Sequence, residues 1–142
     1  MTPETIARLD DDLARDEGFR DRVYIDTVGV PTIGRGINLN EPVDHDILQT
    51  MYERRRNRVL DQCASIKGFS LLSEPRQAVL ANMLYNLGWP RLHEFQKMFV
   101  ALSLDDFDRA AAEMLDSKWA RQVGDRARRL ATQMRTNEWQ EV

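Results

Sequence analysis

Two carboxylates and one hydroxyl stand at regular intervals near the start of the chain. Glu17 is followed after nine residues by Asp26, and Thr32 comes six residues later. Two carboxylic acids facing one cleft are the usual means of cleaving a glycosidic bond, because one protonates the leaving oxygen while the other, ionised, activates a water or attacks the sugar. A hydroxyl such as that of Thr32 can hold the attacking water. Spacing alone is a weak signal, because Glu at a helix end, Asp at a turn and Thr in a strand are commonplace without any catalytic role.

The first element that must position these groups is a helix predicted over 3–17. Thr2 and Pro3 are typical of a helix start, and Gly18 is typical of an end, so Glu17 lies in the last turn. Glu17 shares a helical stripe with three apolar residues, Ile6, Leu9 and Leu13. An apolar surrounding disfavours a charged carboxyl group. Glu17 is therefore the better candidate for the protonated acid, whereas Asp26 should stay ionised in a hydrophilic turn.

A β-ribbon is the second positioning element. It consists of a strand over 23–25, a turn over 26–29 and a returning strand over 30–33. Because Pro31 has no N–H to donate, we expect an edge or loosely paired ribbon. After it, Gly34 and Gly36 permit a close backbone approach or unusual dihedral angles.

Helices are predicted for nearly all of the remaining chain. A long helix over about 44–66 is apolar at its ends and polar in its middle, which suits a bridge between two lobes. Later helices include an apolar one over 78–87, with Asp105 and Asp125 as expected caps further on. The predicted fold class is α+β and mostly helical, with a small β-ribbon lobe and a helical lobe joined by the long helix.

Composition narrows the function classes. The chain has 142 residues, which suits one domain, and a net charge of −3, which argues against a general nucleic-acid binder. Its single cysteine, Cys63, cannot form an internal disulfide. His45 and His93 are far apart and lack partner ligands, so we expect no metal and no other cofactor. No apolar run reaches membrane-spanning length, and no secretory signal is expected.

The residue order itself resembles a known family. The segments DEGFR and YIDTVGVPTIGRG strongly resemble the phage-type lysozymes, the muramidase endolysins of tailed phages (glycoside hydrolase family 24). The resemblance continues over nearly the whole chain, in the segments NMLYNLG, SKW, RARR and RTNEW. It implies a single two-lobe domain, with a ribbon lobe over about 18–45, the linking helix over about 44–66, and a helical lobe over about 68–142 that also holds the helix 3–17.

The resemblance also implies roles for particular residues. Glu17 would be the general acid, and Asp26 with Thr32 would place the water, so that the anomeric configuration inverts. The two carboxyl groups should then lie roughly 6.5–9.5 Å apart. Asn86 matches a polar position lining the cleft, and Arg126 matches an arginine that pairs with the catalytic Glu. Tyr24, inside the motif, and these two residues are candidates for substrate binding or support.

Two departures from the family are visible. Members often carry His after the Thr-Ile-Gly-x-Gly run, where this chain has Ile37, so any ion pair of that His is absent. The chain is also acidic, although peptidoglycan is anionic. Electrostatic steering must therefore come from a local basic region such as 121–135, or be weak.

The predicted activity is hydrolysis of the β-1,4 bond between N-acetylmuramic acid and N-acetylglucosamine. The expected partner is the peptidoglycan glycan strand, with no nucleic acid and no membrane insertion, and the chain is expected to be a monomer. It would be made in the host cytoplasm and act on the wall in the periplasm once the membrane is permeabilised. Two alternatives are a non-catalytic wall-binding or structural module, and a nucleic-acid binder using the arginines of 54–58 and 126–129.

Overall fold

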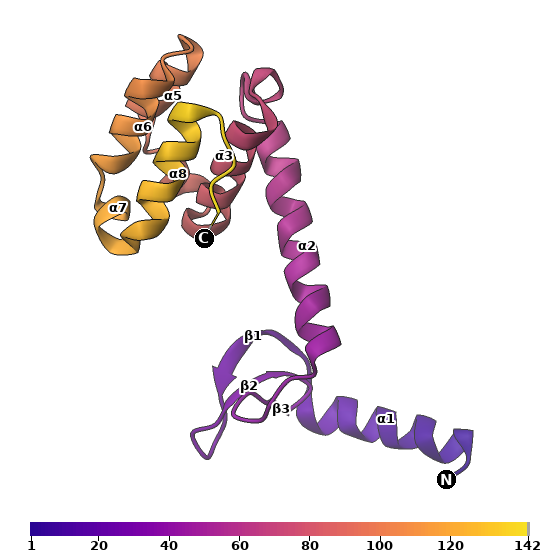
Figure 1. The fold of residues 1–142 in the computed structure, drawn as a ribbon. Coiled ribbons are helices and arrows are strands. Elements are labelled where there is room, and N and C mark those ends of the chain that lie inside the picture. Colours follow the sequence, from indigo (N-terminus) through magenta and orange to yellow (C-terminus); the bar gives the residue numbers. More distant parts are fainter. Residues whose placement is uncertain (142) are drawn as a thin grey trace. The chain divides into compact units, whose positions relative to one another are not determined.

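The computed structural model describes residues 1–141. The chain forms two compact units, Met1–Met51 and Tyr52–Val142, and each is described by itself. Figure 1 gives the order of the elements, which are mostly helices with one small antiparallel sheet. The predicted fold class, α+β and mostly helical, is confirmed.

Helix α1 (Pro3–Glu17) opens the first unit with the bounds that the sequence predicted. The hydroxyl of Thr2 accepts a hydrogen bond from the backbone N–H of Thr5 at 3.2 Å, and Pro3 takes the first helical position. Gly18 ends the helix with a positive φ of 64°. Since no residue of α1 is buried, the packing of this helix on the helical lobe stays a prediction.

Three strands follow α1, namely β1 (Arg20–Ile25), β2 (Pro31–Gly34) and β3 (Ile37–Asn38). They form an antiparallel sheet in the order β1-β2-β3, so β2 is the central strand. Of the two alternatives expected from Pro31, the edge position is therefore wrong, while the pairing of β1 with β2 does contain a register shift between Arg20 and Tyr24. The proline is tolerated because it is the first residue of the strand, where its carbonyl accepts the N–H of Leu39 at 2.9 Å. A two-residue strand such as β3 has no alternating pattern by which to predict it.

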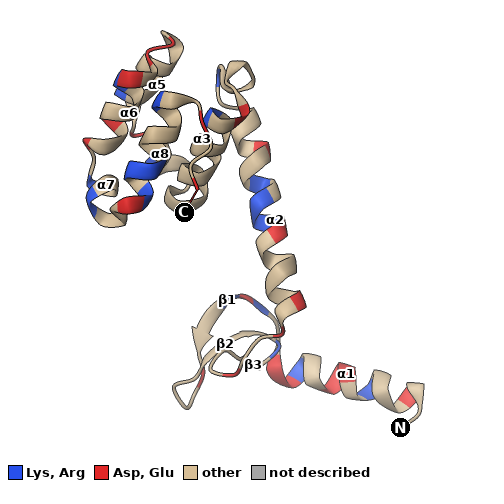
Figure 2. Cartoon of the chain, in the orientation of Figure 1, with Lys and Arg blue, Asp and Glu red and all other residues tan. Residues whose placement is uncertain are grey.

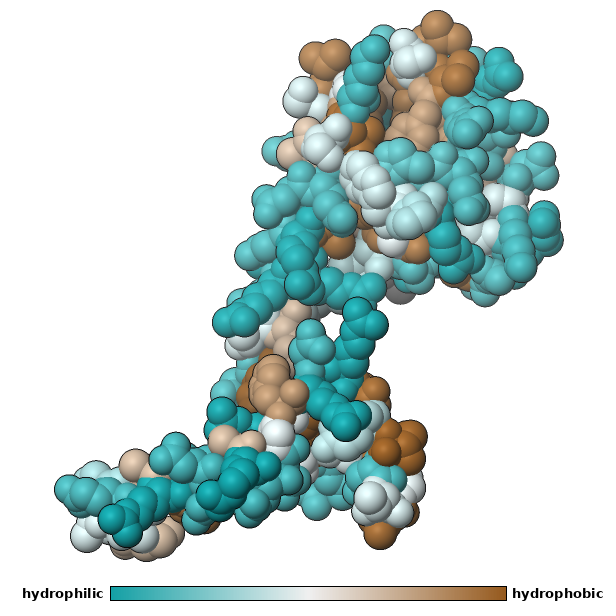
Figure 3. Space-filling model, turned by 180° about the vertical axis from the view of Figure 1, so that it is seen from behind, coloured by the Kyte–Doolittle hydropathy of each residue, from teal (hydrophilic) through white to brown (hydrophobic). Residues whose placement is uncertain are grey.

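The register of the sheet places Thr32 at its centre. Tyr24 lies opposite Thr32 across β1 and β2, and Asn38 lies opposite it across β2 and β3. Thr32, 4% exposed, is the one buried side chain of residues 1–51. Large apolar side chains of this unit are exposed instead, among them Phe19, Val23, Ile25, Val28 and Ile37. Figure 3 shows brown, hydrophobic patches on the surface of this unit. Residues 1–51 thus contain no apolar core of their own.

Helix α2 (His45–Ala64) begins in the first unit and continues into the second, close to the predicted range of 44–66. Its buried residues, Val59 and Cys63, both belong to the second unit. A 3₁₀ turn, η1 (Phe69–Leu71), follows Gly68, whose φ of 82° ends the preceding segment.

The apolar core belongs to the second unit. Its helices are α3 (Glu74–Leu87), α4 (Trp89–Leu92), α5 (Gln96–Ser103), α6 (Phe107–Leu115), α7 (Lys118–Val123) and α8 (Asp125–Thr136). Helix α3 is the buried helix that the sequence predicted, since Val79, Leu80, Met83 and Leu84 are at most 1% exposed. Helix α8 packs against α6 and α3.

Two predicted helix starts in this unit are displaced. Asp106, rather than Asp105, caps α6, because its carboxylate accepts the backbone N–H of Arg109 at 3.0 Å. Asp105 precedes it in a left-handed conformation with φ 54°. Likewise Asp125 is the first residue of α8, and Gly124 takes the cap position. At α6 the adjacent Asp105 and Asp106 carry the same local signal, so the sequence alone does not say which one caps.

Candidate active site

Asp26 lies where β1 ends, and its carboxylate organises the turn that leads to β2. Its Oδ1 atom accepts two backbone hydrogen bonds, from the N–H of Val28 at 2.9 Å and from that of Val30 at 2.8 Å. The backbone N–H of Asp26 in turn donates to the carbonyl of Val30 at 3.0 Å. Backbone donors stabilise a negative charge. Because both of these side-chain hydrogen bonds use Oδ1, the Oδ2 oxygen remains for a water.

Thr32 is connected to the same turn through Val30. The hydroxyl of Thr32 donates to the carbonyl of Val30 at 2.9 Å, the same oxygen that accepts the N–H of Asp26. A hydroxyl that donates to a carbonyl keeps its lone pairs free to accept. One peptide group therefore fixes both predicted water-positioning residues.

Glu17 reaches the sheet at the turn between β2 and β3. A Cβ atom added at Gly36 would lie 2.5 Å from Oε2 of Glu17 and 2.9 Å from its Cδ. The carboxyl group therefore rests directly on the backbone of Gly36, whose φ is +67°. The close approach that the sequence predicted for this glycine is confirmed, and the group that approaches is the candidate acid.

The first unit thus holds all three predicted catalytic residues on or beside one three-stranded sheet. Glu17 contacts the β2–β3 turn, Asp26 follows β1, and Thr32 lies in β2. Tyr24 faces the guanidinium of Arg20, which lies 4.5 Å from the ring centroid. The side chain of Glu17 is exposed, so residues 1–51 do not supply the apolar surrounding that was expected for it.

Asn86 and Arg126, the two other predicted residues, both make contacts within the second unit. The amide oxygen of Asn86 accepts the indole N–H of Trp119 at 2.7 Å. Arg126 donates from Nε and Nη2 to the amide oxygen of Asn82, at 2.9 and 2.7 Å. The pair between Arg126 and Glu17 stays a prediction.

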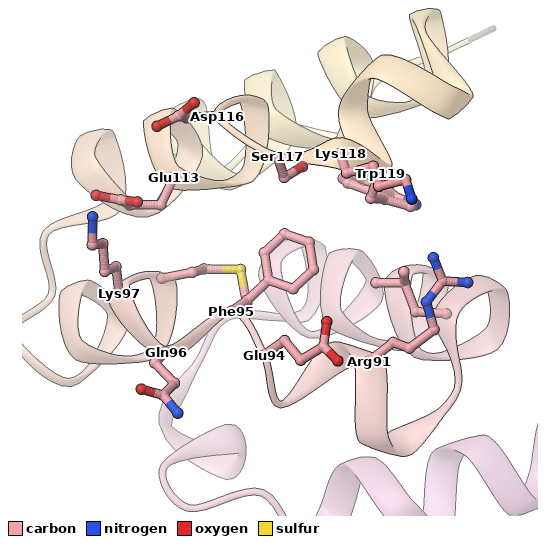
Figure 4. Close-up of a pocket in the computed structure, with 12 residues that line it drawn as sticks. Arg91, Glu94, Phe95, Gln96, Lys97, Glu113, Asp116, Ser117, Lys118 and Trp119 are labelled. Atoms are coloured by element: carbon pink, nitrogen blue, oxygen red, sulfur yellow. The ribbon is translucent and has the colours of Figure 1, made fainter.

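A cavity of about 420 Å³ lies beside Trp119 in the second unit. Figure 4 shows the ring of Phe95 pointing from the chain segment 91–97 toward the segment 113–119. The rings of Phe95 and Trp119 meet edge to face, with centroids 6.1 Å apart. The rim carries cationic and anionic side chains, which are Arg91, Lys97 and Lys118, and Glu94, Glu113 and Asp116. This lining suits a ligand that carries both charges together with an apolar part.

Sequence reasoning predicted a close approach at Gly36 but not that Glu17 makes it, and it assigned no role to Val30 or Asn82. Asn82 was visible as an amide inside an apolar helix, which requires a partner when buried, but its partner Arg126 is 44 residues away. Val30 acts through its backbone, which side-chain patterns do not reveal. Among residues 1–141, no group of three His, Cys, Asp or Glu side chains could hold a metal ion. In the same residues, no helix is long and apolar enough to cross a membrane.

Comparison with known proteins places the chain in a family. The phage lysozyme family matches residues 14–138. The pre-baseplate central spike protein Gp5 of Enterobacteria phage T4 is 30% identical over 152 residues, which take in 83% of this chain and 26% of Gp5. The chain thus spans about a quarter of that relative's length. The family match covers most of the chain and includes all three candidate catalytic residues. The chain therefore belongs to the phage lysozyme family.

Proposed function

We propose that this protein is a peptidoglycan hydrolase that cleaves the β-1,4 bond between N-acetylmuramic acid and N-acetylglucosamine. Glu17 donates a proton to the leaving oxygen, and Asp26 with Thr32 holds the attacking water. The observation that carries this proposal is the backbone of Val30, whose N–H donates to the Asp26 carboxylate and whose carbonyl accepts the Thr32 hydroxyl in one turn. Water attack on the face opposite the leaving group gives inversion.

The site chemistry supports different roles for the two carboxyl groups. Asp26 accepts two backbone N–H groups, which stabilise its ionised form as the base requires. Glu17 accepts no hydrogen bond in the described part of the chain, and it lies against a glycine. An acid that donates its proton to substrate needs such a free carboxyl oxygen.

Two stages of phage infection are candidates for the point at which this activity is used. Release from an infected cell at lysis, as a free endolysin, is the role implied by the likeness to muramidase endolysins. A particle-borne enzyme is the second candidate, and it is favoured by the name of the T4 relative, a pre-baseplate central spike protein. In both settings the substrate is the glycan strand of the wall. A non-catalytic wall-binding module would not require an acid, a base and a hydroxyl together.

The test is the clearing of purified peptidoglycan by the wild type, by Glu17→Gln and by Asp26→Asn. Each variant is nearly isosteric, and the amide oxygen introduced by Asp26→Asn can still accept the two N–H groups of its turn, so both variants should fold. We expect each to lose at least about a hundredfold in rate. Clearing at the wild-type rate by Glu17→Gln would disprove its role as the acid. The first-formed anomer, followed by NMR, tests inversion separately.

A further inference from the structure

A second cavity of the helical unit, of about 680 Å³, lies between the chain segment 65–72 and helix α5. Gly68 ends the segment that follows α2, and the 3₁₀ turn η1 after it has three residues, too few to fill the space beside α5. Pockets of roughly 300–1,000 Å³ hold drug-sized ligands. None of the residues predicted to act in catalysis or substrate binding lines this cavity.

The floor of the cavity is apolar and buried. Ile66, Leu80 and Leu102 line it and are 8%, 1% and 9% exposed. The side chains of Phe69 and Phe99 are half-buried beside them. The polar residues of the lining are all exposed and form its rim, which consists of Ser65, Lys67, His93, Gln96, Ser103 and Asp105. Because a buried polar group without a partner is costly, the part of a ligand that enters this cavity must be apolar.

One wall of the cavity is fixed by ring contacts. The imidazole of His93 has its centroid 4.1 Å from that of Trp89 and 5.7 Å from that of Phe99. Its Nδ1 atom donates to the carbonyl of Trp89 at 2.8 Å. A wall that is already ordered loses little conformational entropy when a ligand binds.

Leu71 extends the apolar surface beyond the mouth of the cavity. It belongs to the lining, yet its side chain is 89% exposed. A single exposed leucine is ordinary on a protein surface. This one adjoins an apolar cavity, so a long apolar ligand that entered the cavity would also cover Leu71.

The rim carries one cation whose charge is not offset. Lys67 takes part in no ion pair among residues 1–141. Asp105, the acid of the rim, attracts the guanidinium of Arg76, which offsets part of its negative charge. Figure 2 shows blue on the loop that follows α2 and red on the loop between α5 and α6. The rim therefore favours an anionic group on an otherwise apolar ligand.

We propose that this cavity binds a free anionic amphiphile with one hydrocarbon chain, of the long-chain carboxylate class. The hydrocarbon occupies the apolar cavity and covers Leu71, and the carboxylate lies beside Lys67. A single free chain is favoured over a membrane surface, because the apolar floor is buried and a bilayer cannot enter it. The binding uses none of the candidate catalytic residues, so it does not depend on the proposed function.

The first experiment tests the charge. Calorimetric titration of the whole chain with laurate, below the concentration at which laurate forms micelles, measures its affinity. Lys67→Met removes the cation of the rim, and Lys97→Met makes the same change at an exposed lysine outside this cavity. We expect Lys67→Met to bind laurate about three- to tenfold more weakly and Lys97→Met to bind it as the wild type does. The difference should shrink at about 0.5 M salt.

The second experiment tests the apolar contact. Leu71→Ser should fold, because the side chain of Leu71 is exposed, and we expect it to bind laurate about three- to tenfold more weakly. Leu60→Ser is the matched control, since Leu60 is 48% exposed and lies outside the lining. It should bind laurate as the wild type does.

Three outcomes would overturn the inference. Equal affinity of the wild type for laurate and for dodecyltrimethylammonium would show that the rim does not select an anion. Laurate binding that is unchanged in both Lys67→Met and Leu71→Ser, or reduced equally in their controls, would place laurate outside this cavity. Sedimentation with phosphatidylglycerol vesicles that is lost in Leu71→Ser, without any binding of laurate, would show that the partner is a membrane surface.

Discussion

The carboxyl group of Glu17 occupies the space that a side chain at Gly36 would fill. A Cβ atom there would lie 2.5 Å from Oε2, closer than unbonded atoms approach. Glycine at this position therefore serves two purposes, since it permits the positive φ of the turn and leaves room for the acid. The position of the candidate acid and the backbone of the β2–β3 turn therefore depend on each other.

Replacing Gly36 with Ala should displace the Glu17 carboxyl group and reduce the rate of peptidoglycan clearing by at least about tenfold. Part of any effect would come from strain, because alanine at φ +67° is unfavourable. The matched control is Gly68→Ala, where φ is +82° and a Cβ would meet nothing within 4 Å. In urea, the free energy of unfolding should fall by a similar amount in both variants. Only Gly36→Ala should also clear peptidoglycan more slowly than the wild type. Equal activity of the two would contradict the positioning role.

The hydroxyl of Thr32 should matter more than its methyl group. Thr32→Val keeps the shape of this buried side chain but removes the donor to the Val30 carbonyl and the acceptor for a water. We expect Thr32→Val to clear peptidoglycan about tenfold or more slowly than the wild type. Thr32→Ser restores the hydroxyl and should recover much of that rate. A fully active Thr32→Val would show that the hydroxyl holds no catalytic water.

Local signals in the sequence predicted the parts of this fold that local interactions determine. The bounds of α1 follow from Thr2, Pro3 and Gly18, which act on the nearest turns. The central position of β2 was not predictable, because it depends on β3, a strand of two residues. For the same reason the edge position, one of the two alternatives inferred from Pro31, was wrong.

The candidate site likewise has local features that the sequence predicted and contacts between distant residues that it did not. The spacing of Glu17, Asp26 and Thr32 is readable along the chain, and a turn built on an Asp carboxylate is a local structure. The contact of Glu17 with Gly36, and that of Asn82 with Arg126, join residues far apart in sequence. A single sequence showed that these residues were unusual, but it did not say what each would contact.

Cys63 should make stability depend on pH in the alkaline range. Burial raises the pKa of its thiol from 9.0 to about 11. Between these values the unfolded chain loses the thiol proton while the folded chain keeps it, so the free energy of unfolding falls as pH rises from about 9 to 11. Urea denaturation at about pH 8 and about pH 10.5 measures this, and the thiol's share should be at most about 2 kcal/mol. Cys63→Ala should lose correspondingly less stability over this range; an identical loss would exclude the thiol as the cause.

Arg76 should stabilise the junction between α3 and the end of α8. Its Nε donates to the carbonyl of Met134 at 2.8 Å, its Nη2 to that of Arg135 at 3.3 Å, and the guanidinium lies 3.4 Å from the ring centroid of Phe107. A cation at the carboxyl end of a helix is favourable, and it satisfies carbonyls that the helix leaves unpaired.

Arg76→Met keeps an apolar side chain of similar length but removes the charge over the Phe107 ring and both hydrogen bonds. We expect a loss of about 1–3 kcal/mol in the free energy of unfolding, measured in urea. Arg76→Lys keeps the charge without the planar donor geometry, so its free energy of unfolding should lie between those of the wild type and Arg76→Met. Arg109→Met is the control, since the side chain of Arg109 is exposed. If both methionine variants lost the same stability, general charge rather than the capped helix end would account for the effect.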